Sequence, residues 1–140
     1  MAEHSDLIMV IDDEVKLSRA ISRILTNAGY QVLLAHDGES ALKTMAGKNP
    51  VVVLLDLMMP GMNGREVCRK IRECSPITKV IYFTARAEAY KPPELTELRA
   101  EADAIINKPA QSAKILAEIK RVTSLGFDKI QHQSVMAFKD

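Results

Sequence analysis

The sequence has no excess of charge of either sign. Its 140 residues include 19 Lys and Arg against 18 Asp and Glu, a formal net charge of +1. So small a charge gives no electrostatic footprint for wrapping nucleic acid or a membrane surface. Long hydrophobic runs are also absent: the longest, such as Val51–Leu55, span five residues, whereas a membrane-spanning helix needs roughly 18 or more. We therefore expect neither nucleic acid nor a membrane among its partners.

Cysteine is scarce too. Cys68 and Cys74 lie in or beside one predicted helix, and no second pair exists to complete a zinc site. Residues 1–6 are acidic and lack the basic and apolar regions of a secretory signal peptide. These features predict a cytoplasmic protein with reduced thiols.

The length predicts one domain, since domains typically contain about 100–200 residues. With 47% apolar residues, a chain of this size can form a core without metal or disulfide cross-links. We assign the folded domain to residues 1–125. Residues 126–140 mix polar and apolar residues without a clear period, which predicts a C-terminal tail or a truncated linker.

Apolar, β-prone runs alternate with helical patterns along the chain. The predicted strands are Leu7–Ile11, Gln31–Ala35, Val51–Leu55, Val80–Phe83 and Ala104–Ile106. The predicted helices are Glu14–Asn27, Ser40–Ala46, Arg65–Glu73, Ser112–Leu125 and one beginning near Pro93. This alternation predicts an α/β fold, a doubly wound five-stranded parallel sheet flanked by helices on both faces.

Acidic residues follow two of the predicted strands. Asp12 and Asp13 come directly after the first strand, and Asp56 follows the third. Ligands of open parallel sheets gather at the carboxyl ends of strands, so we expect these carboxylates to lie together. Neighbouring carboxylates raise one another's pKa unless a positive group lies among them. Mg²⁺, which prefers oxygen ligands, suits such a cluster.

Two further polar residues are predicted at the same edge. Thr84 ends the fourth strand, and Lys108 ends the fifth. Taken singly, each residue has an ordinary explanation: an aspartate can cap a helix or stabilise a turn, and a lysine can be a solvated edge charge. Their joint arrival from four strand ends favours one functional site.

Four segments give the chain its resemblance to a known family. They are IMVIDDE at residues 8–14, DLMMPGMNG at 56–64, FTAR at 83–86 and NKP at 107–109. Over residues 7 to about 125 the chain resembles the receiver domain of bacterial two-component response regulators, in the stand-alone, chemotaxis-regulator-like form. The resemblance implies a flavodoxin-like sheet with strand order 2-1-3-4-5.

The resemblance also implies a phosphorylation chemistry. Asp56 would be the phosphoacceptor, Thr84 the switch hydroxyl and Lys108 the phosphate contact. The implied Mg²⁺ ligands are Asp12, Asp13, Asp56 and the main-chain carbonyl of Met58. Such a protein is a signalling switch that catalyses its own aspartyl phosphorylation and dephosphorylation. A histidine kinase or histidine phosphotransfer protein would be the donor, an unidentified protein the target, and the chain a monomer or weak dimer.

The chain departs from the family pattern at Ile105, at Ala110 and in the longer spacing from Thr84 to Lys108, which contains Pro92 and Pro93; three other functions remain as alternatives. Receivers usually carry an aromatic residue three positions before the lysine, where this chain has Ile105. A phosphorylation-independent adaptor would use the fold alone. An aspartyl-phosphate phosphohydrolase would need a second aspartate at Met58. A nucleotide-binding module would need a glycine-rich phosphate loop after the first strand, and the sequence has none there.

Overall fold

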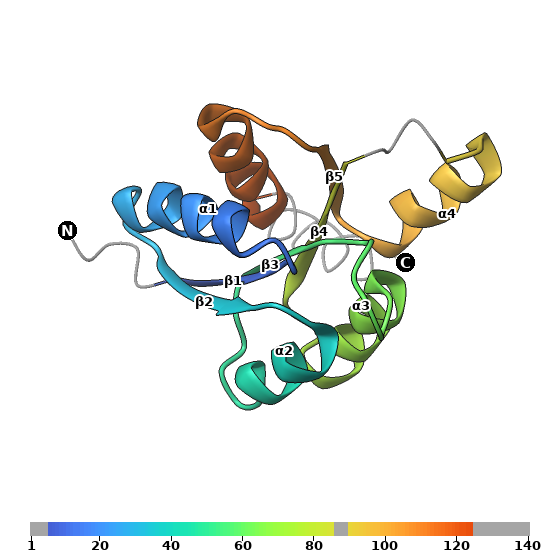
Figure 1. Cartoon of the computed structure of the whole chain (residues 1–140), viewed down its shortest axis with the longest axis horizontal. Helices are drawn as coiled ribbons and strands as arrows, with labels where there is room; N and C mark the ends of the chain where they lie inside the picture. Colours follow the sequence, from blue (N-terminus) through green and yellow to red (C-terminus); the bar gives the residue numbers. More distant parts are fainter. Residues whose placement is uncertain (1–5, 86–89, 125–140) are drawn as a thin grey trace, which may run out of the picture.

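A parallel five-stranded sheet forms the centre of the molecule (Figure 1). The computed structural model describes residues 6–85 and 90–124. The strands are β1 (Leu7–Ile11), β2 (Gln31–Ala35), β3 (Val52–Leu55), β4 (Lys79–Thr84) and β5 (Ala104–Asn107). All neighbouring pairs are parallel, in the order β2-β1-β3-β4-β5. The predicted sheet and strand order are therefore confirmed.

Helices cover both faces of this sheet. They are α1 (Val15–Asn27), α2 (Gly38–Met45), α3 (Gly64–Cys74), α4 (Pro92–Glu101) and a final helix whose described part is residues 112–124. One core cluster joins α2, α3 and α4 to the sheet, and a second joins α1 and the final helix to the opposite face. All four residues of β3 are buried because this central strand is covered on both sides.

The predicted boundaries hold to within two residues at most helix and strand ends. Helix α2 begins at Gly38 rather than Ser40, because the Asp37 side chain accepts a hydrogen bond from the Ser40 amide at 2.7 Å and caps the helix. Helix α4 begins at Pro92, one residue before the predicted start. A proline fits this first position because its missing N–H would have no partner there.

Some expectations fall outside the described residues. They concern the tail at residues 126–140 and Arg86 of the fourth sequence motif. Among the residues that the structure does describe, no helix combines the length and apolar character needed to cross a membrane.

Candidate functional site

Three carboxylates meet at the carboxyl edge of the sheet, as the sequence predicts. Asp12 follows β1, Asp56 follows β3, and Asp13 lies beside them. One carboxylate oxygen from each lies within 4.8 Å of the others. Asp12 and Asp56 are only 1% and 4% exposed, whereas Asp13 is exposed. The cluster thus combines two buried acids with one that reaches solvent.

The backbone orients each buried carboxylate. Asp12 Oδ1 accepts a hydrogen bond from the Glu14 amide at 2.9 Å, and Asp56 Oδ1 accepts one from the Met58 amide at 3.0 Å. In each case the second oxygen, Oδ2, instead faces the ammonium of Lys108. The local turn after each strand therefore fixes one oxygen and leaves the other for charged partners.

Lys108 supplies positive charge to this acidic cluster. Its Nζ lies 2.7 Å from Asp12 Oδ2, 3.4 Å from Glu14 Oε1 and 3.5 Å from Asp56 Oδ2, and its side chain is 9% exposed. Burial disfavours the ammonium, but its contact with Asp12 and the nearby acids outweigh this effect and raise the pKa of Lys108. Lys108 directly follows β5, and its bond to Pro109 is cis.

Asp56 differs from an ordinary aspartate in its acidity. Burial is the largest cause and raises its pKa to about 6; the Met58 amide and Lys108 lower it, while Asp12 and Asp13 raise it further. Near neutral pH the carboxylate of Asp56 is therefore mostly ionised, and Lys108 does not fully offset the unfavourable burial of its charge. A cation that added charge here would favour the ionised form.

Thr84 lies beside these groups at the end of β4. It is 1% exposed, and its carbonyl accepts a hydrogen bond from the Lys108 amide at 2.8 Å. Thr84, Asp56 and Lys108 line one cavity of about 690 Å³. The structure thus brings together every side chain that the sequence placed at this edge.

Sequence reasoning did not assign Glu14, Ala85, Tyr90 or Glu94 to this cavity, although each of them lines it. Glu14 continues the acidic run after β1, and that adjacency was a usable signal. Glu94 lies in the first turn of α4, and Tyr90 lies two residues before that helix. They belong to no motif or strand end, so only the tertiary structure places them here.

The residues present fit a hard divalent cation. Asp12 Oδ2 is buried and forms an ion pair with Lys108, but no hydrogen bond of good angle with any group in the described part of the chain. Two buried carboxylates and one exposed carboxylate supply the oxygen donors that Mg²⁺ prefers, and the exposed side leaves room for its waters. This acidic triad is typical of a Mg²⁺ site.

Comparisons with known proteins agree with the fold and identify a family. Residues 8–120 match the family model described as the response regulator receiver domain. The response regulator MprA of Mycobacterium ulcerans is 35% identical over 136 residues, covering 95% of this chain and 58% of MprA. The receiver domain protein (CheY-like) of Methanospirillum hungatei has a TM-score of 0.78 at 27% identity, covering 89% of this chain and 98% of that one.

A third relative was solved with ligands. The response regulator protein TrrA from Thermotoga maritima, in complex with Mg²⁺-BeF, has a TM-score of 0.73 at 30% identity, covering 84% of this chain and 98% of TrrA. The chain belongs to the response regulator receiver domain family. The chain spans only 51–58% of the length of curated relatives such as MprA and the response regulator ArlR of Staphylococcus haemolyticus.

Family membership settles the class of activity. The chain is a phosphoaccepting signalling switch of two-component systems, and its acidic pocket contains Asp12, Asp13 and Asp56.

Proposed function

We propose that Asp56 accepts the phosphoryl group and that Asp12, Asp13, Asp56 and the main-chain carbonyl of Met58 hold Mg²⁺. One observation carries this proposal: the carboxylates of Asp12, Asp13 and Asp56 lie within 4.8 Å of one another, with the ammonium of Lys108 beside them. Of the three carboxylates, Asp56 is the one that both contacts Lys108 and lines the cavity.

The proposed step is a direct transfer of a phosphoryl group. A carboxylate oxygen of Asp56 forms a bond to phosphorus, while the bond from phosphorus to the donor breaks and its electron pair leaves with the donor. The donor atom is the imidazole nitrogen of a phosphohistidine or the acyl-phosphate oxygen of acetyl phosphate. Bound Mg²⁺ would supply neutralising charge to the phosphoryl oxygens.

Lys108 and Thr84 act on the product in this proposal. The ammonium of Lys108, already 3.5 Å from Asp56 Oδ2, pairs with a phosphoryl oxygen. The Thr84 hydroxyl donates a hydrogen bond to another, which draws the end of β4 toward Asp56. This movement turns a local change of charge into a change of surface.

The wider role follows from the same chemistry. We propose that a histidine kinase or a histidine phosphotransfer protein is the donor, and that the output is a protein contact made by a cytoplasmic monomer or weak dimer. The folded receiver would comprise residues 1–125, with 126–140 as a tail or truncated linker. A net charge of +1 supports a protein target over nucleic acid.

Intact mass spectrometry tests this proposal. The protein is incubated with Mg²⁺ and acetyl phosphate, beside Asp56→Asn and a matched control, Asp37→Asn, which changes an exposed aspartate that caps α2. We expect one added phosphoryl group in the wild type and in Asp37→Asn, only when Mg²⁺ is present, and none in Asp56→Asn. Labelling of Asp56→Asn would move the acceptor elsewhere. No labelling of any variant would favour a phosphorylation-independent adaptor.

A further inference from the structure

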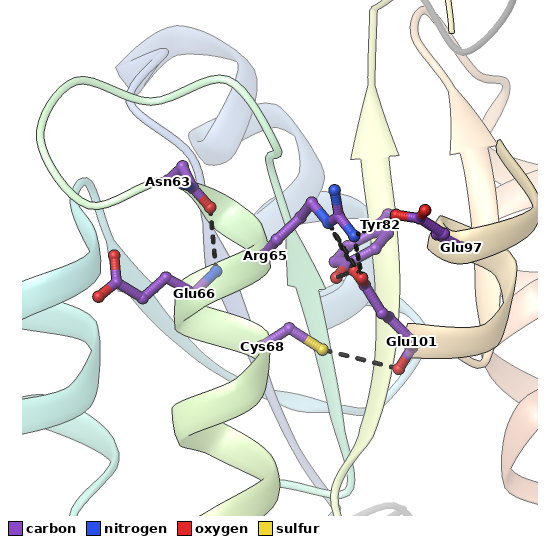
Figure 2. Close-up of polar contacts among 7 residues, drawn as sticks. All are labelled: Asn63, Arg65, Glu66, Cys68, Tyr82, Glu97 and Glu101. Atoms are coloured by element: carbon purple, nitrogen blue, oxygen red, sulfur yellow. Dashed lines mark hydrogen bonds and ion pairs between the residues drawn. The ribbon is translucent and has the colours of Figure 1, made fainter. Parts of the chain in front are cut away.

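One carboxylate at the end of α4 is held from two directions. Glu101 Oε1 accepts a hydrogen bond from the Tyr82 hydroxyl at 2.8 Å, and both Glu101 oxygens lie 3.0 Å from Nε of Arg65 (Figure 2). Arg65 also contacts Glu97, one turn earlier on α4, at 3.1 Å. Glu101 thus joins β4, α3 and α4 through a single side chain.

The first of these contacts leads back to Thr84. Tyr82 lies two residues before Thr84 on β4, so both side chains point to the same face of the sheet. Tyr82 is 0% exposed, and its ring belongs to the core cluster on the α3 and α4 side. A shift of the end of β4 would therefore move the Tyr82 hydroxyl relative to α4, because tight packing leaves the ring little freedom of its own.

The second contact leads back to Asp56. Arg65 follows Gly64, whose amide donates a hydrogen bond to the Leu57 carbonyl at 3.3 Å. A Cβ atom added at Gly64 would lie 2.6 Å from the carbonyl oxygen of Asp56. The first turn of α3 is therefore in direct contact with the backbone of the proposed phosphoacceptor, and Arg65 is the next residue along.

A third observation concerns the neighbouring strand. Ile105 of β5 is the register partner of Tyr82, and its aliphatic side chain has neither a ring nor a hydroxyl. In this chain the aromatic side chain with a hydroxyl at that level of the sheet is Tyr82. Its bond to Glu101 gives β4 a polar contact with α4 that Ile105 cannot make.

We propose that Glu101 is a positioning residue that couples the Asp56 site to α4, through Tyr82 on one side and Arg65 on the other. This inference rests on the proposed function, in which Thr84 engages the phosphoryl group. When the end of β4 moves toward Asp56, Tyr82 and Arg65 change their separation, and Glu101 can no longer satisfy both in the same position. The end of α4 then shifts.

Such a shift would change a neighbouring surface. Glu101 lines a groove of about 610 Å³ together with Arg65, Arg69 and Arg72 of α3. Arg72 also donates a hydrogen bond to the Glu101 carbonyl at 2.8 Å. Movement of Glu101 would therefore alter the balance of charge along this groove.

Hydrogen–deuterium exchange measures the coupling. Exchange in α4 and α3 is compared with and without Mg²⁺ and acetyl phosphate, and intact mass gives the phosphoryl occupancy of each sample. The variants are Tyr82→Phe, which removes only the hydroxyl, and Glu101→Gln. In the wild type we expect phosphorylation to change exchange in α4. In both variants we expect full phosphoryl occupancy. The phosphorylation-dependent change of exchange in α4 should fall to roughly half or less of its wild-type size, since contacts that share one partner are strongly coupled.

Two control variants separate this role from general stability. Tyr30→Phe removes a tyrosine hydroxyl on the opposite face of the sheet, and Glu97→Gln weakens a contact of Arg65 while leaving Tyr82–Glu101 intact. Both variants should show the same phosphorylation-dependent change of exchange in α4 as the wild type.

The outcomes distinguish the two proposals. Three results would overturn the coupling alone. Phosphorylated Tyr82→Phe could show the same change of exchange in α4 as the wild type, or Tyr30→Phe could lose as much of that change as Tyr82→Phe does. The phosphorylated wild type could also show no change of exchange in α4. A wild type that gains no mass would overturn the phosphoacceptor assignment and the coupling with it.

Discussion

The ammonium of Lys108 lies 2.7 Å from Asp12 Oδ2, closer than to either of its other two carboxylate partners. Both side chains are largely buried, at 9% and 1% exposure. Without a metal, Lys108 is therefore the cation that balances Asp12. A phosphoryl group on Asp56 would offer the same ammonium a second, more highly charged partner. Phosphorylation of Asp56 would therefore compete with Asp12 for Lys108.

Replacing Lys108 with Ala should destabilise the protein when Mg²⁺ is absent. Removing one partner of a buried ion pair costs roughly 3–5 kcal/mol, and Asp12 would be left without its cation. Mg²⁺ binding should persist and restore part of this loss, so the metal should raise Tm more in Lys108→Ala than in the wild type. Thermal unfolding followed by circular dichroism, with and without Mg²⁺, measures both effects.

The matched control for this change is Lys114→Ala. Lys114 pairs with Glu118 at 3.5 Å on the final helix, and its side chain is 59% exposed. An exposed pair contributes at most about 1 kcal/mol, so its loss should leave the Mg²⁺ response unchanged. Equal Mg²⁺ responses in Lys108→Ala and the wild type would contradict the assigned role. A normal phosphorylation-linked change in Lys108→Ala would remove Lys108 from the switch.

Asp56→Asn should stabilise the metal-free protein above neutral pH. The folded-state pKa of Asp56 is about 6, above its ordinary value of 3.8, so the ionised carboxylate opposes folding above pH 6 and this cost disappears as the pH falls toward 3.8. Asparagine removes the charge, and we expect a gain of roughly 1–3 kcal/mol at pH 8. Urea unfolding at several pH values tests this, and a gain that did not shrink between pH 6 and pH 4 would contradict it.

The sequence could place these side chains at one edge of the sheet because they occupy special positions in the pattern. Asp12, Asp56 and Thr84 stand at the ends of strands that are buried on both faces and read as continuous apolar runs. In a parallel sheet all such ends lie at one edge, so the strand boundaries alone bring these side chains together. The same argument placed Lys108 beside them.

Contacts between helices were beyond the sequence pattern. Tyr82 looks like an ordinary aromatic residue of a buried strand, and Arg65 and Glu101 look like charged residues on helix surfaces. The contact between Arg65 and Glu101 joins positions 36 residues apart and depends on how α4 lies against α3. Glu14 is a different case: its partner Lys108 is 94 residues away, but its place directly after Asp12 and Asp13 was a usable signal.

Asp13→Asn should weaken Mg²⁺ binding without weakening the fold. Asp13 is exposed, so the substitution should change the free energy of unfolding by less than about 0.5 kcal/mol. Its amide oxygen carries no charge, and we expect Mg²⁺ affinity to fall roughly tenfold or more. Isothermal titration calorimetry gives the affinity. Asp12→Asn is the comparison: it should lower both stability and affinity, because Asp12 also holds Lys108. Wild-type affinity in Asp13→Asn would exclude Asp13 as a ligand.

Gly64→Ala should impair both folding and phosphorylation. The added Cβ would lie 2.6 Å from the Asp56 carbonyl oxygen and 2.7 Å from Leu57 Cα, both backbone atoms that cannot move independently of the site. Overpacking of this kind costs roughly 1–3 kcal/mol, and α3 should shift away from Asp56. Gly47→Ala is the control: φ is +75° there, so it is strained, but no atom lies within 4 Å and the site is untouched. If the two variants lost similar stability, but only Gly64→Ala gained phosphate slowly from acetyl phosphate, the close approach of α3 would be established as a requirement of the acceptor site; equal rates would contradict it.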